Sequence, residues 1–244
     1  MDILYGRNPV LEALRAGRSA RKIVVAGALR PEARLTEILV LAEARDILVE
    51  EVSRQRLDDI AHTEHHQGVA GYFHARQALT IHDLLDTVRE PALLVVLDGI
   101  QDPQNVGAIA RSAEACGADG IVVPRHHAAP LTPAAVKASA GATEHLLLVT
   151  VPNLAQGLDV IGDAGIWRVG LDADARARYD SVDLTGPTAI VVGAEGAGMR
   201  RLTREHCDVL VSIPMLGHVA SLNAGAAAAV LLFEVQRQRG FTAR

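Results

Sequence analysis

A chain of 244 residues, 49% of them hydrophobic, can bury one large core or form two domains of ordinary size. With 22% charged residues and no apolar run near the roughly 18 residues that a membrane span needs, the sequence argues against a membrane protein. The net charge of −5 argues against a protein that coats nucleic acid through bulk positive charge. The opening residues lack the basic and long apolar regions of a secretory signal, so we expect a cytoplasmic protein. Cys116 and Cys207 have no Cys or His at a metal-ligand spacing, which predicts reduced, packed thiols and no metal site.

The first 75 residues alternate short helix and strand patterns. Helices are predicted over residues 8–17 and 34–45, and strands over residues 22–27 and 47–53. Within residues 1–34 the basic side chains outnumber the acidic ones by four. Such an excess is more often a solvated face than a phosphate-binding patch. The pattern predicts a small α/β unit with a modest basic bias.

A histidine cluster follows this unit, with His62, His65 and His66 around Glu64. Their order does not match the two histidines one helical turn apart that hold zinc on a helix. A surface loop is therefore favoured over a metal site.

The pattern changes after a stretch of mixed charge at residues 76–91, which we interpret as a linker with at least one helical turn. Six apolar runs then appear without polar alternation, at residues 92–98, 120–124, 145–151, 167–172, 188–196 and 209–215. Strands buried on both faces need such runs, so they predict a parallel sheet flanked by helices. The predicted boundaries are 1–75, 76–91 and 92–244.

The stretch "DPQNVGAIARS" opens a helix after the first of these runs. Its apolar residues recur at helical spacing on one stripe, and Arg111 points away from that stripe. Asn105, close to the start of the helix, is a candidate cap. The apolar stripe consists of Val106, Ile109, Ala110 and Ala113.

Two further stretches combine a strand end with unusual backbone freedom. In "VVGAEGAGMRR" three glycines surround Glu195, with a GxxGxG spacing that differs from the GxGxxG of a dinucleotide fold. A ligand loop and a plain tight turn both remain open. In "SIPMLGHVASLNAGAAAAVLLFE" either Ser221 or Asn223 can cap the last helix. The alanine-rich start of that helix, with Gly225 inside it, suits either close backbone packing or an ordinary core helix.

Taken in order, the three stretches resemble the three motifs of the SpoU (TrmH) class of the SPOUT methyltransferases. The first motif, N-x-G-x-x-x-R, falls on Asn105, Gly107 and Arg111. The second, G-x-E-G-x-G, falls on residues 193–198, and the third is I-P-M followed by S-L-N. The stretches "YGRNPVLEAL", "HQGVAG" and "GAEGAGMRRLTREHCD" look particularly like the RlmB branch, the 23S ribosomal RNA guanosine 2'-O-methyltransferases. One departure is "SLNAG", where the family commonly has S-L-N-V-S.

The resemblance implies an α/β fold in which a parallel sheet carries a C-terminal trefoil knot and follows a small, ribosomal-protein-like RNA-binding domain. It implies that S-adenosylmethionine lies against the loops of the knot and that RNA contacts the basic N-terminal domain. The implied cofactor-binding residues are Val192, Gly193, Gly196, Ile213, Met215, Leu216 and Leu222. The first candidates for RNA binding are Arg7, Arg18, Arg21 and Lys22.

The implied activity is methyl transfer from S-adenosylmethionine to the ribose 2'-hydroxyl of a guanosine in 23S ribosomal RNA, by a homodimer and without metal. Because a guanidinium stays protonated, we expect the motif arginine to hold phosphate and the developing oxyanion instead of acting as a free base. Two alternatives stay open: a SpoU-class enzyme acting on transfer RNA or another ribosomal nucleotide, and a non-catalytic RNA-binding protein of ribosome assembly. The implied catalytic residues are Arg111, Asn105, Glu195, Ser221 and Asn223.

Overall fold

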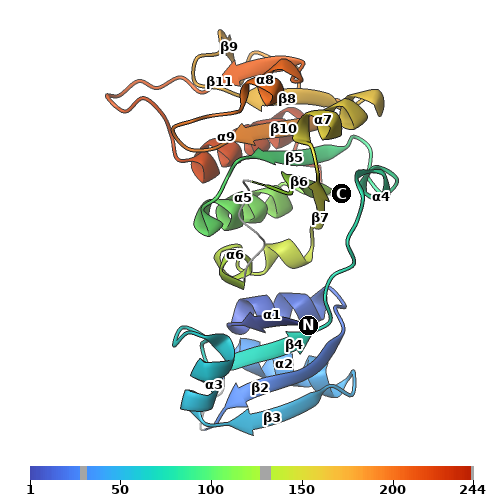
Figure 1. Ribbon diagram of the computed structural model, residues 1–244, viewed down its shortest axis with the longest axis vertical. Coiled ribbons are helices and arrows are strands. Elements are labelled where there is room, and N and C mark those ends of the chain that lie inside the picture. The colour runs from blue at the N-terminus through green and yellow to red at the C-terminus, as the bar shows by residue number, and fades with distance from the viewer. Residues whose placement is uncertain (28–31, 127–132, 243–244) are drawn as a thin grey trace. The chain divides into compact units, whose positions relative to one another are not determined.

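The computed structural model of the chain describes residues 1–27, 32–126 and 133–242. It divides into two compact units (Figure 1). The first unit comprises Met1–Gln77 and Leu131–His145, and the second comprises Ala78–Pro130 and Leu146–Arg244. Each unit has its own sheet and its own hydrophobic core.

The first unit is built on a four-stranded mixed sheet in the order β1-β4-β2-β3. Its strands are β1 (Asp2–Tyr5), β2 (Ala20–Ala26), β3 (Leu48–Val52) and β4 (Val69–Phe73). Its first three helices are α1 (Arg7–Arg15), α2 (Ala33–Glu43) and α3 (Arg54–Ala61). Strand β4 pairs antiparallel with β1 and β2, whereas β2 and β3 are parallel. The two helices and two strands predicted here are confirmed, while β1, α3 and β4 were not predicted.

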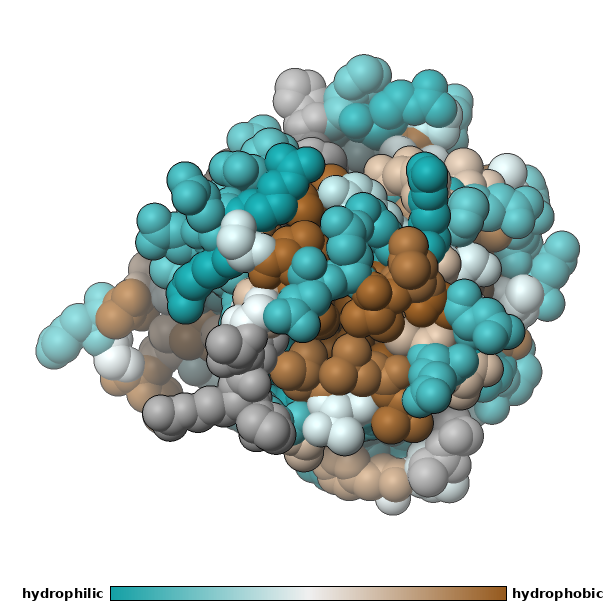
Figure 2. All heavy atoms as spheres, turned by 90° about the horizontal axis from the view of Figure 1, so that it is seen from below, coloured by the Kyte–Doolittle hydropathy of each residue, from teal (hydrophilic) through white to brown (hydrophobic). Residues whose placement is uncertain are grey.

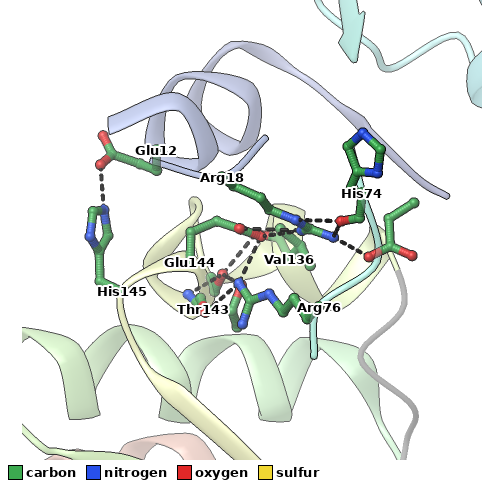
Figure 3. A network of polar contacts seen from close by, with 10 residues as sticks. Glu12, Arg18, His74, Arg76, Val136, Thr143, Glu144 and His145 are labelled. Carbon is green, nitrogen blue, oxygen red and sulfur yellow. Dashed lines mark hydrogen bonds and ion pairs between the residues drawn. The ribbon is translucent and has the colours of Figure 1, made fainter. Parts of the chain in front are cut away.

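A segment from between two strands of the second sheet also belongs to the first unit. It contains α6 (Pro133–Ala138) and the 3₁₀ helix η1 (Ala142–Glu144). The side chain of Glu144 is 1% exposed and forms ion pairs with Arg18 and Arg76, and His145 pairs with Glu12 at 2.8 Å (Figure 3). Sequence patterns had assigned this segment to the second domain, because ion pairs between residues so far apart in the chain leave no periodic signal.

One surface of the first unit carries exposed apolar side chains on α2 and on the edge strand β3. Val40 is 57% exposed and Leu48 is 63% exposed. Figure 2 shows apolar side chains on the face seen from below, the side on which β3 lies in Figure 1.

The second unit contains a seven-stranded sheet in the order β7-β6-β5-β10-β8-β11-β9, with every pairing parallel. The predicted parallel sheet is confirmed, and each of the six apolar runs contains one strand. The seventh strand, of only two residues, was not predicted. The strands are β5 (Leu93–Asp98), β6 (Gly120–Pro124), β7 (Leu147–Val151), β8 (Trp167–Leu171), β9 (Ala177–Arg178), β10 (Thr188–Gly193) and β11 (Val209–Ser212).

In its described residues the second unit contains five helices: α4 (Ile81–Leu85), α5 (Pro103–Ala115), α7 (Leu154–Asp163), α8 (Arg201–Glu205) and α9 (Ala224–Gln238). The central strands β5 and β10 are fully buried, as strands covered on both faces must be. Helix α4 lies within the expected linker, yet its Leu84 is buried in the core of this unit. Among the described residues no helix is both long and apolar enough to cross a membrane.

Candidate active site

Helix α5 brings the first motif to the site. Its cap is Asp102, whose carboxylate accepts a hydrogen bond from the Gln104 amide at 2.9 Å, and Pro103 occupies the first helical position. The interpretation of Asn105 as a cap is therefore wrong: Asn105 lies in the first turn and is 8% exposed. The predicted apolar stripe of α5 is confirmed, since its four members are buried and Arg111 is exposed.

The second motif forms a tight loop after β10. Ala194 and Gly198 close it with two backbone hydrogen bonds of 3.1 and 2.8 Å. A Cβ atom on Gly193 would lie 2.2 Å from backbone atoms of Gly198 and Met199, so no side chain fits where the loop returns. Gly196 and Gly198 have φ angles of 77° and 66°, which favour glycine. The glycines are therefore required by the turn, whichever ligand the loop meets.

A carboxylate that sequence reasoning did not select anchors the chain just after this loop. Asp98 ends the buried strand β5, and its side chain is 0% exposed. It accepts hydrogen bonds from the backbone amide of Arg200 at 2.7 Å and from the Arg200 Nε at 2.6 Å. The sequence signal that could have identified Asp98 is an acidic residue at the end of an otherwise apolar strand.

The third motif leads into α9, where Asn223 is the cap. Its Oδ1 accepts hydrogen bonds from the amides of Gly225 at 2.9 Å and Ala226 at 3.3 Å, so of the two predicted caps Asn223 is the one used. A Cβ on Gly225 would lie 2.9 Å from the Ala108 Cβ of α5. The small alanine and glycine residues at the start of α9 thus permit the close approach of these two helices.

Three motif side chains meet in one polar cluster, which we call the amide–carboxylate cluster: Asn105, Asn223 and Glu195. The Nδ2 of Asn223 donates to the Oδ1 of Asn105 at 2.7 Å and to the Oε2 of Glu195 at 3.3 Å. The Nδ2 of Asn105 donates to the same Glu195 oxygen at 3.4 Å. Two amides thus hold one oxygen of the Glu195 carboxylate, and the second oxygen keeps its acceptor capacity.

A cavity of about 280 Å³ lies beside this cluster, at the carboxyl ends of β8, β10 and β11 and the start of α9. Crevices at the carboxyl ends of parallel strands are the usual ligand sites of open α/β sheets. Six of the seven residues expected to bind cofactor line it, and so do Glu195 and Ser221; the seventh, Leu216, has a fully exposed side chain outside the lining. The six are Val192, Gly193, Gly196, Ile213, Met215 and Leu222.

Arg111 does not reach this cavity. It lies six residues after Asn105, which is about 9 Å along the helix axis. It is exposed and forms no hydrogen bond or ion pair with the residues that the structure describes. All donors of its guanidinium are therefore available to a ligand or a second subunit.

The four candidates for RNA binding differ in their surroundings. Arg7 pairs with Glu32, and Lys22 pairs with Glu50 at 2.6 Å. Arg18 is the most engaged: its side chain is 11% exposed, pairs with Asp2 and Glu144, and donates to the carbonyl oxygen of His74 (Figure 3). Arg21 is exposed and has no polar partner among the described residues.

The histidine cluster does not bring three possible ligands together: among the described residues, no group of three His, Cys, Asp or Glu side chains is placed so that it could hold a metal ion. His66 is 1% exposed. Its Nδ1 accepts a hydrogen bond from the Gly68 amide at 2.9 Å, and its Nε2 lies 2.8 Å from the Asp58 carboxylate. His66 thus fixes the turn that leads into β4.

The fold and the cavity are typical of an α/β enzyme that binds a small molecule at the carboxyl edge of its sheet. The SpoU rRNA Methylase family matches residues 92–233, and the family described as RNA 2'-O ribose methyltransferase substrate binding matches residues 3–79. The chain belongs to the SpoU rRNA methylase family and is an RNA 2'-O-ribose methyltransferase with an N-terminal substrate-binding domain.

Relatives and solved structures agree with this assignment over nearly the whole chain. An "uncharacterized tRNA/rRNA methyltransferase" of Mycolicibacterium vanbaalenii is 45% identical over 241 residues, which are 98% of this chain and 77% of the relative. The SpoU methyltransferase AviRb of Streptomyces viridochromogenes, solved with the cofactor AdoMet, has a TM-score of 0.83 at 29% identity and covers 98% of this chain and 91% of its own. An AdoMet-bound rRNA methyltransferase of Sinorhizobium meliloti has a TM-score of 0.80 at 26% identity, covering 97% and 87%.

Proposed function

We propose that the chain transfers a methyl group from S-adenosylmethionine to the ribose 2'-hydroxyl of a guanosine in 23S ribosomal RNA. Family membership supports the reaction, and the RlmB-like stretches at residues 5–14 and 193–208 favour this target. The observation that carries the proposal is that the second and third motifs, distant in sequence, line one cavity, while Asn105 of the first motif joins both of them in the polar cluster beside it.

The residues around the cavity fit S-adenosylmethionine, the cofactor named for two similar structures. The lining is rich in glycine and alanine, which let a ligand approach the backbone. The backbone N–H groups of Gly196, Ser221 and Leu222 donate no hydrogen bond within the described residues and can serve a ligand. Glu195 also lines the cavity, and its carboxylate suits a cationic ligand, whereas the Asp172 carboxylate in the same lining already pairs with Arg204 at 3.1 Å. When bound, the cofactor supplies a methyl group activated on a sulfonium.

The protein must orient a ribose hydroxyl, which is a poor nucleophile because it stays protonated at neutral pH. In this proposal the amide–carboxylate cluster fixes Glu195 at the cavity edge, and Ser221 adds a hydroxyl beside it. Arg111 holds an RNA phosphate and the developing oxyanion through its planar donors. The proton leaves through phosphate or water.

We further propose that the enzyme is a homodimer in which a second copy completes the site. Helices α5 and α9 pack together where Gly225 approaches Ala108, and exposed residues of both helices include Ala108 and Phe233, the latter 47% exposed. A second copy against this surface would bury Phe233 and bring an otherwise unpartnered Arg111 toward the partner's cavity. Sedimentation of the wild type should give a dimer and Phe233→Arg a monomer, and a wild-type monomer would contradict this arrangement.

A mixing experiment tests the shared site. Arg111→Ala and Glu195→Gln should each be inactive alone, whereas a mixed dimer holding one of each should regain part of the activity at its one intact site. No regain after subunit exchange would place both residues in the same protomer's site. Arg111→Lys keeps the positive charge but loses the planar set of guanidinium donors. Turnover near the wild-type value in this variant would therefore refute the proposal that Arg111 holds the phosphate and the developing oxyanion.

Mass-spectrometric mapping of 2'-O-methyl groups in ribosomal and transfer RNA, from cells with and without this protein, tests the substrate. The proposal expects one guanosine of 23S ribosomal RNA to lose its methyl group. A lost site in transfer RNA or at another ribosomal nucleotide would correct the target and retain the reaction. No lost site, together with no cofactor binding in a calorimetric titration, would favour a non-catalytic RNA-binding protein.

A further inference from the structure

A second cavity, of about 470 Å³, lies entirely within the first unit. Its wall brings together the start of α1, the end of β2, the starts of α2 and α3, and the turn before β4. Three arginines from three different helices line it: Arg7, Arg34 and Arg54. Sequence reasoning singled out only Arg7, because arginines spaced this far apart share no pattern.

Most of the positive charge that the three arginines bring to this cavity is not balanced by acidic residues of the described lining. Glu32 is the acidic residue in its described lining, and it already forms an ion pair with Arg7. Arg34 and Arg54 form no hydrogen bond or ion pair with any described residue. Two guanidinium groups with free donors thus face a concave space, where like charges raise the local potential for an anion.

The wall beside these arginines is held in place before any ligand binds. The Gln67 side chain accepts a hydrogen bond from the Arg7 amide at 3.0 Å, and the Arg7 Nε donates to the Gln67 carbonyl oxygen at 3.1 Å. His66 also holds this turn, because its Nδ1 accepts a hydrogen bond from the Gly68 amide. Asn8 also lines the cavity, and its side-chain amide forms no hydrogen bond within the described residues. It therefore offers one donor pair and one acceptor to a ligand.

We propose that this cavity binds one phosphate-bearing nucleotide of the RNA substrate, with Arg34 and Arg54 on the phosphate and Asn8 on the base edge. The inference rests on the proposed function, since it takes RNA as the ligand. Planar guanidinium groups bind phosphate oxygens in pairs, and proteins recognise single-stranded nucleotides in pockets of this kind. By contrast, the donors of Arg18 and Lys22 already serve acids of the same unit.

Helix α3 supplies a matched control for the test. Arg54 lines the cavity, whereas Arg56, two residues later, is also exposed, lies outside the lining and has no side-chain partner in the described part of the chain. The full-length variants Arg34→Ala, Arg54→Ala and Arg56→Ala should be titrated against a fluorescent in vitro transcript of unmodified 23S ribosomal RNA, over a range of salt concentrations and without methyl donor.

We expect each cavity variant to weaken RNA binding roughly tenfold. Each should also reduce the slope of log Kd against log salt by about 0.7 to 0.9, the contribution of one phosphate contact. Arg56→Ala should stay near the wild type in both quantities. The thermal midpoint should be unchanged in all three, because neither cavity arginine holds the fold. Equal losses for Arg54→Ala and Arg56→Ala would overturn the proposal.

The same variants separate this inference from the proposed function. If the wild type methylates RNA and the double variant Arg34→Ala/Arg54→Ala keeps the wild-type KM for RNA, the cavity assignment fails and the function stands. If the wild type binds RNA with the expected variant pattern but transfers no methyl group, the proposed function fails and the cavity assignment stands.

Discussion

Asn223 joins helix stability to site geometry, and three substitutions at this one position separate the two roles. Its Oδ1 caps α9, while its Nδ2 donates to Asn105 and Glu195. Asn223→Ala removes both roles. Asn223→Ser keeps a cap but lacks the amide donor, and Asn223→Asp keeps the cap but replaces the donor with a second carboxylate.

The magnitudes follow from these contacts. Loss of the cap costs about 1 kcal/mol. Loss of the 2.7 Å bond leaves the Asn105 oxygen, in a residue only 8% exposed, without its partner, which costs about 1–3 kcal/mol. We therefore expect Asn223→Ala to lower the free energy of unfolding by about 2–4 kcal/mol and Asn223→Ser by about 1–3 kcal/mol.

Asn223→Asp adds a pH dependence. The introduced carboxyl would lie about as close to Glu195 as the present 3.3 Å contact, and two carboxylates at this distance repel each other. The pKa of the pair would rise above the unfolded value of about 4, so the loss of stability should be full at neutral pH and shrink as the pH falls toward that value.

Urea unfolding at about pH 7 and about pH 5 measures both effects. The wild type at each pH is the reference, so general acid effects cancel. Equal losses for Asn223→Ala and Asn223→Ser would refute the capping role of the Asn223 Oδ1. An Asn223→Ser variant as stable as the wild type, or an Asp penalty that does not change with pH, would refute the assignment of the Asn223 amide as a donor within the cluster.

Two further predictions concern the glycine loop and the thiols. Gly193→Ala should lower the unfolding free energy by about 3 kcal/mol or more, because its Cβ would meet backbone at 2.2 Å, whereas Gly196→Ala, with open space around it, should cost only about 1–2 kcal/mol for its positive φ. Similar losses of thermal midpoint in both would contradict this ranking. Burial raises the pKa of Cys116 to about 11 and that of Cys207 to about 12, so both thiols should resist a disulfide reagent at about pH 8 in the native protein and react quickly in urea. Rapid native labelling would show that either thiol is more open than the structure indicates.

The strands of the second unit were predictable because each is a continuous apolar run, and burial on both faces is the simplest cause of such a run. Strand β9 escaped notice because two residues carry no periodicity. The structure groups the segment around Glu144 with the first unit, which the sequence pattern did not predict, for a different reason. It joins the first unit through ion pairs with Arg18, 126 residues earlier, and with Arg76. Contacts over such separations follow from folding and cannot be read from local pattern.

For the site, the sequence supplied residue types and order, and the structure supplied distances. The glycine loop and the start of the last helix, both singled out in the sequence, line the cavity, but the cap of α5 is Asp102, three residues before Asn105. That shift matters chemically, since Asn105 in the first turn is free to meet Asn223. The roles of Asp98 and of the cavity arginines Arg34 and Arg54 depend on which partners surround them. Only the three-dimensional structure shows that Asp98 is buried and that Arg34 and Arg54 have no polar partner among the described residues.

The departure "SLNAG" from the common family pattern has a physical reason in the packing of α5 against α9. At Gly225 a Cβ would lie 2.9 Å from the Ala108 Cβ and 3.1 Å from the Asn223 Oδ1. A serine here would therefore push apart the two helices or displace the oxygen that caps α9. Since the same Asn223 side chain holds the amide–carboxylate cluster, a methylene group added at this position would also shift Glu195 at the cavity edge. The glycine thus preserves the geometry of the site in a chain that has Ala108 on the facing helix, and the two residues are best understood as a pair.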